Sequence, residues 1–125
     1  MARAAPQVQH LEAAEVPVWR SNAGDRVRVV VGSFNAVSSP LVPAEPFTLL
    51  DIQLRHEISL PLPAEHNTVV YVLTGTIVVG ADGHTETVEG GHALAIGGDG
   101  GRVSFDALRP AHFLPCRDPN STSRW

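Results

Sequence analysis

Short runs of β-branched and aliphatic residues, separated by glycine, proline, asparagine and aspartate, make up almost the whole chain. Several runs alternate apolar and polar positions, which is the period of a strand with one buried face. The chain has 11 glycines and 10 prolines among its 125 residues, and helical periodicity is nearly absent. Short strands with turn residues between them are typical of antiparallel sandwiches and barrels. The pattern therefore predicts a single all-β domain, long enough to form a core without disulfides.

The predicted strands cover residues 27–31, 47–55, 58–62, 69–73, 76–79, 85–88, 93–96, 102–105 and 112–114. In the second of them, Leu50, Ile52 and Leu54 share one face, which predicts that this face is buried. Residues 69–73 are apolar on both faces, which predicts an inner strand covered on both sides.

The segments between these strands carry specific turn signals. The Asp82-Gly83 pair predicts a tight hairpin, and the glycine-rich residues 97–101 predict a wide turn. Residues 33–46 contain three prolines and are predicted to form a loop. Residues 10–16 predict one helical turn, which the proline that follows would end.

Composition excludes several classes of function. The net charge is −4 and all nine basic residues are arginines; they form no run, so no track for nucleic-acid phosphates is predicted. Cys116 is the only cysteine, which excludes an intrachain disulfide and a cysteine-based zinc site. The N-terminus has no signal-peptide core, and the longest apolar stretch is too short to span a bilayer. A cytoplasmic protein without nucleic-acid or membrane contacts is expected.

The six histidines do not show the spacing of a metal site. A metal ion needs three or four ligands that converge from a rigid frame, yet no HxH, HxxH or HExxH motif occurs. The six are His10, His56, His66, His84, His92 and His112. His56, His66, His84 and His92 sit beside a turn or at a strand end, where a surface or loop role is the simpler interpretation.

Four stretches, spanning about residues 7–115, closely resemble the C-terminal half of pirin and pirin-like proteins. They read VPVWRSNAGDRVRVVVGSF, PFTLLDIQL, LPLPAEHNTVVYVLTGTIVV and VEGGHALAIGGDGGRVSF. The resemblance implies an RmlC-like cupin fold, a double-stranded β-helix or antiparallel β-barrel, and makes the chain a bicupin fragment. Residues 1–6 are expected to be disordered, and residues 116–125 depart from the family as an atypical tail. A frameshift in a truncated gene is one hypothesis for that tail.

In the family, the N-terminal cupin holds one iron through three histidines and a glutamate and is associated with quercetin 2,3-dioxygenase activity. This chain has no counterpart of that half, so the resemblance implies no cofactor here. The general cupin motif, anchored on residues 71–75, places its four metal ligands at positions where this chain has no ligating side chain. These positions are Pro61, Pro63, Thr68 and Arg102. His66 falls between them, as a loop residue at a strand entrance.

The expected function is therefore a metal-free structural or interaction barrel without catalysis of its own. Its partner would be a second copy or an N-terminal pirin-type cupin, since a lone barrel exposes the apolar surface that its neighbour would cover. Two alternatives stay open. One is a metal-dependent dioxygenase with the non-standard ligands His56, Glu65, His66 and His92. The other is a small-ligand binding barrel whose pocket includes Tyr71.

Overall fold

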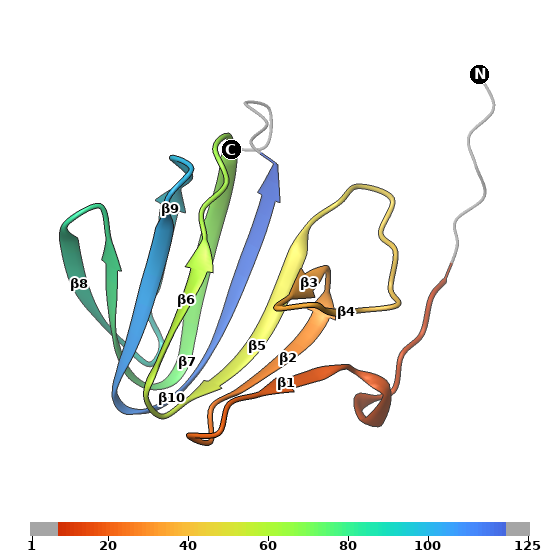
Figure 1. The fold of residues 1–125 in the computed structure, drawn as a ribbon, viewed down its shortest axis with the longest axis horizontal. Helices are drawn as coiled ribbons and strands as arrows, with labels where there is room; N and C mark the ends of the chain where they lie inside the picture. The colour runs from red at the N-terminus through yellow and green to blue at the C-terminus, as the bar shows by residue number, and fades with distance from the viewer. Residues whose placement is uncertain (1–7, 120–125) are drawn as a thin grey trace.

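The computed structural model describes residues 8–119, which form ten strands and one turn of 3₁₀ helix (Figure 1). The elements are η1 (Ala13–Glu15), β1 (Val18–Arg20), β2 (Arg26–Val31), β3 (Ser33–Phe34), β4 (Val37–Ser38), β5 (Thr48–Leu54), β6 (Glu57–Pro61), β7 (His66–Ala81), β8 (His84–Glu89), β9 (Ala93–Gly97) and β10 (Arg102–Pro119). The segment expected to be disordered, residues 1–6, lies outside the described residues. No helix in the described part is long and apolar enough to cross a membrane.

Eight strands form one antiparallel sheet in the order β1-β2-β5-β10-β7-β8, with β6 paired to β10 and β9 paired to β7. The long strands β7 and β10 run through both sides of the structure and bend the sheet around a common interior (Figure 1). Strands β1 and β8 are the ends of the hydrogen-bonded path, so the barrel is not closed. The all-β fold class is confirmed.

The core forms where strand alternation turns apolar side chains inward. Leu50, Ile52 and Leu54 are 3%, 0% and 1% exposed, which confirms the predicted buried face of β5. Phe105 and Phe113, both on β10, are fully buried with ring centroids 5.1 Å apart. Aromatic pairs at this separation add to the stability that burial alone supplies.

The predicted strand boundaries were wrong where a glycine or bulge bends a strand without ending it. Residues 69–73 and 76–79 belong to one strand, β7, because Gly75 takes a φ of +84° and lets the strand turn. Register shifts between Ala107 and Phe113 play the same part in β10.

The predicted turns agree with the structure more closely than the predicted strand boundaries do. The loop joining β7 and β8 is confirmed as a two-residue hairpin, since Ala81 pairs with His84 while Asp82 and Gly83 have φ values of 51° and 78°. The helical turn is present as η1. Residues 33–46 are not a loop throughout, because β3 and β4 form a small hairpin at their start.

Candidate functional site

Two of the four positions laid over cupin ligands meet at a small hollow in the mouth of the barrel. Pro61 ends β6, and Thr68 on β7 is 3% exposed. The hollow measures about 10 Å³, room for about one water molecule. Its lining is Thr48, Leu50, Leu60, Pro61, Thr68, Pro115 and Arg117. The other two positions lie outside it: Pro63 follows β6 in a connecting loop, and exposed Arg102 donates hydrogen bonds to Ser59.

A guanidinium group occupies this mouth. Arg117 on β10 donates one hydrogen bond to the carbonyl of Pro61 at 3.2 Å and one to Oγ1 of Thr48 at 3.4 Å. Burial lowers the pKa of Arg117 from its usual value, although an arginine side chain stays protonated in proteins.

The residues of the mouth do not fit an iron ion. Proline side chains carry no donor atom, a threonine hydroxyl is a poor iron ligand, and the positive charge of Arg117 would repel a metal cation placed beside it. Arg117 lies in the segment predicted to be an atypical tail, yet β10 continues to Pro119. Sequence reasoning therefore missed this residue.

The structure does not bring together the four residues of the non-standard ligand set. The described residues contain no group of three or more His, Cys, Asp or Glu side chains that could hold a metal ion. The ring nitrogens of His66 and His92 lie 3.2 Å from nearby carbonyl oxygens of the backbone, and His56 lies 3.5 Å from Asp25. Glu65 is exposed.

His66 lies where the sequence placed it, at the entrance of a strand. Its backbone N–H donates to the carbonyl of Pro63 at 3.2 Å, and its own carbonyl accepts from the N–H of Gly98 at 2.8 Å. These two bonds tie the start of β7 to the preceding loop and to the end of β9. The backbone of His66 thus has a structural role that does not depend on its imidazole side chain.

Strand β7 is buried on one face only. Val70 and Val72 point into the core and are fully buried, whereas Tyr71 and Leu73 are 43% and 38% exposed. The prediction that both faces are covered was therefore wrong for the chain alone, and Tyr71 does not line the barrel interior.

The outward face of β7 continues across its neighbours. Register pairs Tyr71 with Leu114 and Ala93, and pairs Cys116 with Val69 and Leu49. We call this surface the apolar outer face. It consists of Leu49, Val69, Tyr71, Leu73, Ala93, Ala95, Leu114 and Cys116.

The thiol of Cys116 on this face is predicted to be a slow nucleophile. Partial burial, with the negative charge of Asp118, raises the pKa of Cys116 above its ordinary value of 9.0. Because the thiolate is the reactive form, iodoacetamide should alkylate the folded chain more slowly at neutral pH than the urea-unfolded chain. The rate in the folded chain should rise with pH to a midpoint above 9.0. A rate at pH 7 equal to that of the unfolded chain would contradict the prediction.

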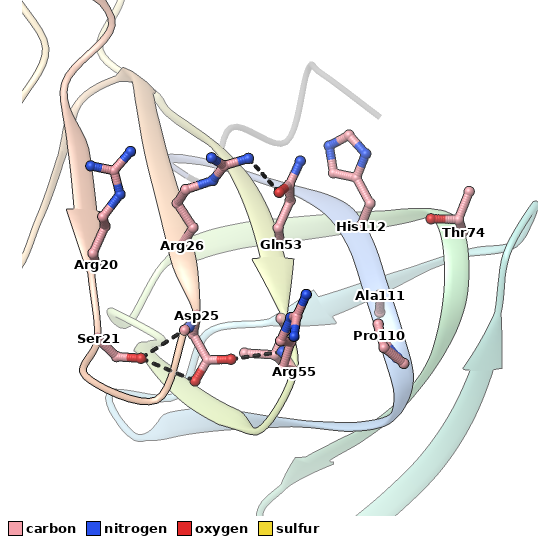
Figure 2. Close-up of a pocket in the computed structure, with 12 residues that line it drawn as sticks. Arg20, Ser21, Asp25, Arg26, Gln53, Arg55, Thr74, Pro110, Ala111 and His112 are labelled. Atoms are coloured by element: carbon pink, nitrogen blue, oxygen red, sulfur yellow. Dashed lines mark hydrogen bonds between the residues drawn. The ribbon is translucent and has the colours of Figure 1, made fainter.

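A larger groove of about 680 Å³ lies over β1, β2, β5 and β10 (Figure 2). Its lining is Arg20, Ser21, Gly24, Asp25, Arg26, Gln53, Leu54, Arg55, Thr74, Pro110, Ala111 and His112. No sequence motif marks the groove, because its residues come from segments far apart in the chain. Only the strand pairing brings them together.

Asp25 stabilises one wall of the groove through hydrogen bonds to the backbone. It is 3% exposed, and its Oδ1 accepts hydrogen bonds from the backbone N–H groups of Arg55 and His56 at 2.6 and 3.0 Å. The hydroxyl of Ser21 lies 3.3 Å from Oδ2. Burial alone would raise the pKa of Asp25, but these two N–H groups and nearby His56 outweigh it and hold the pKa below 3.8.

Comparison with known structures defines the class of this fold. An RmlC-like cupin from Shewanella frigidimarina is 11% identical with a TM-score of 0.62, and the match covers 94% of this chain and 96% of that one. A quercetin 2,3-dioxygenase from Acinetobacter baumannii is 25% identical with a TM-score of 0.76, over 89% of this chain and 38% of that one. The chain is a cupin domain.

Within the cupins, the chain is similar to pirin and pirin-like proteins. It is 28% identical to human pirin over 91% of its own length and 42% of that protein, and 33% identical to the Arabidopsis thaliana pirin-like protein At1g50590 over 87% of its length and 37% of that protein. No family model matches the chain. It spans about two fifths of the length of these relatives.

Proposed function

We propose that this chain is the non-ligating cupin domain of a pirin-type pair, and that its function is to pack against a second cupin barrel through the apolar outer face. The observation that carries the proposal is the exposure of Tyr71 and Leu73 in a strand that is apolar on both sides. Contiguous exposed apolar surface marks sites of protein association.

The composition of the barrel mouth supports the same role. Pro61 and Thr68 are not iron ligands, and Arg117 already supplies a cation there. In this proposal, the iron and any dioxygenase chemistry belong to the partner barrel, and this domain contributes a covering surface. No catalytic residue is assigned in this chain.

The length of the relatives supports a barrel as the occupant of the face. Since the chain covers 42% of human pirin, that protein has room for a second domain of similar size. A stable interface buries about 800 Å² on each partner, and four strands contribute to the apolar outer face. In a solution of this chain alone, the barrel available to cover the face is another copy.

Self-association through the apolar outer face is therefore expected. Sedimentation velocity over ~1–100 µM should show a reversible shift from monomer to dimer. Leu73→Arg should weaken the association by about tenfold or more, since it places a charge within the surface that the partner would bury. Leu108→Arg is the matched control: Leu108 is 62% exposed but lies outside the apolar outer face, so this variant should associate like the parent chain. A chain that stays monomeric at every concentration would overturn the proposal.

The two alternative functions receive less support. A dioxygenase with non-standard ligands would need His56, Glu65, His66 and His92 close together, and the described residues form no such group. A small-ligand barrel would need space inside, whereas the hollow at the mouth has room for about one water molecule.

A further inference from the structure

Five polar or charged residues form a single row across the outside of the sheet. Register pairs Arg20 with Arg26, Arg26 with Gln53, Gln53 with His112, and His112 with Thr74. Paired residues in regularly paired strands present their side chains on the same face, about 5 Å apart; this applies from Arg20 to His112, whereas register shifts flank the pairing of His112 with Thr74. Figure 2 shows the five side chains in this order along the groove.

The row makes the groove a positive site on a negative chain. The chain carries a net charge of −4, yet Arg20, Arg26 and Arg55 all line this groove. Among the described residues, the ion pairs found are His56 with Asp25 and His112 with Asp51. None of the three guanidinium groups is therefore paired with a described carboxylate.

The other polar groups of the groove form hydrogen bonds elsewhere and do not neutralise its three guanidinium groups. Asp25, the one carboxylate of the lining, is directed at backbone N–H groups. One nitrogen of Arg26 donates to the amide oxygen of Gln53 (Figure 2), which orients the guanidinium and leaves its other donors. His112 is held by Asp51 at 2.7 Å. Pro110, an exposed residue of the lining, gives the groove apolar wall area.

We propose that this groove binds a small organic anion, whose carboxylate or phosphate group lies among Arg20, Arg26 and Arg55 while an apolar body contacts Pro110. Guanidinium groups match the planar, two-oxygen geometry of these head groups and bind them with charge-assisted hydrogen bonds. A concave site with a few convergent polar groups is the usual form of a small-molecule site.

This inference is independent of the proposed packing function. All lining residues come from one chain, so the site is complete in a monomer. Leu73 and Tyr71, on which the packing proposal depends, do not line the groove. A failure of either proposal leaves the other standing.

The test is a titration of the full-length chain with three probes that share one ring: benzoate, phenyl phosphate and neutral benzamide. Isothermal calorimetry or amide NMR shifts should show saturable binding of at least one anion and none of benzamide. Arg26→Gln and Arg20→Gln should each weaken binding by about tenfold, or ~1.4 kcal/mol, at the lower end of what charged hydrogen bonds contribute. Arg102→Gln makes the same charge change outside the groove and should leave binding unchanged.

The outcomes separate the head groups and can reject the site. Preference for benzoate or for phenyl phosphate identifies the natural head group as carboxylate or phosphate. Benzamide bound as tightly as benzoate, equal weakening by Arg102→Gln, or no saturation by either anion up to ~10 mM would each overturn the proposal. Arg20 is exposed on an edge strand, so Arg20→Gln keeps the test decisive if Arg26→Gln unfolds.

Discussion

Replacement of Gly75 by alanine is expected to destabilise the fold by about 3–5 kcal/mol. A Cβ at this position would lie 2.3 Å from the carbonyl oxygen of Pro110 and 2.6 Å from Cα of Ala111. These are backbone atoms of β10, so the paired strands β7 and β10 would have to separate at this point of close approach. The φ of +84° adds strain for any residue with a Cβ. A domain has only ~5–15 kcal/mol of stability in total, and urea denaturation should show a large fraction of it lost.

Gly83→Ala is the matched control for this effect. Gly83 also has a positive φ, of +78°, but a Cβ there would meet no atom within 4 Å. Its replacement should cost only the conformational strain, about 1 kcal/mol. Similar losses in the two variants would show that the close approach of β7 and β10 at Gly75 contributes nothing.

Replacement of Asp25 by alanine is expected to cost about 3 kcal/mol, because it leaves the N–H groups of Arg55 and His56 without their acceptor in a buried position. Asp25→Asn keeps one oxygen and should cost about half as much. Asp99→Asn is the control. Asp99 also accepts a backbone hydrogen bond, from Gly101, but in an exposed turn, so the loss there should stay below about 0.5 kcal/mol.

The cost at Asp25 should depend on pH in a defined direction. The pKa of this carboxyl is lower in the folded chain than its ordinary value of 3.8. The ionised form therefore stabilises the fold fully above the unfolded-state pKa, and this stabilisation is lost as pH falls through the folded-state pKa. The difference in unfolding free energy between the parent chain and Asp25→Asn should shrink from about pH 5 to pH 2. A difference that does not change over this interval would contradict the assignment.

Local patterns in the sequence predicted local structure well. The alternation of Leu50, Ile52 and Leu54 identified the inner face of β5, because a period of two is a property of the strand itself. The Asp82-Gly83 pair identified a hairpin, since few residues accept a positive φ at both turn positions. Gly75 misled the strand assignment for the opposite reason: a glycine can end a strand or bend it, and only the position of β10 decides which.

The residues of the barrel mouth and of the groove could not be identified from the sequence alone, because strand register brings them together. The prediction that Pro61 and Thr68 stand at cupin ligand positions followed from the family resemblance, but the presence of Arg117 in the mouth required the register of β10. The row from Arg20 to Thr74 joins five strands, and a shift of one residue in any pairing would turn one of its side chains into the core. The apolar outer side of β7 was visible in the sequence, although its exposure was not.

The guanidinium in the barrel mouth has a consequence for how the domain responds to its surroundings. A barrel that folds around a metal ion gains stability in proportion to the logarithm of free metal and loses it to chelators. Here the cation is covalently part of β10 and is held by Pro61 and Thr48. Its local concentration is therefore constant, and the mouth of this barrel keeps its charge whether iron is abundant or scarce.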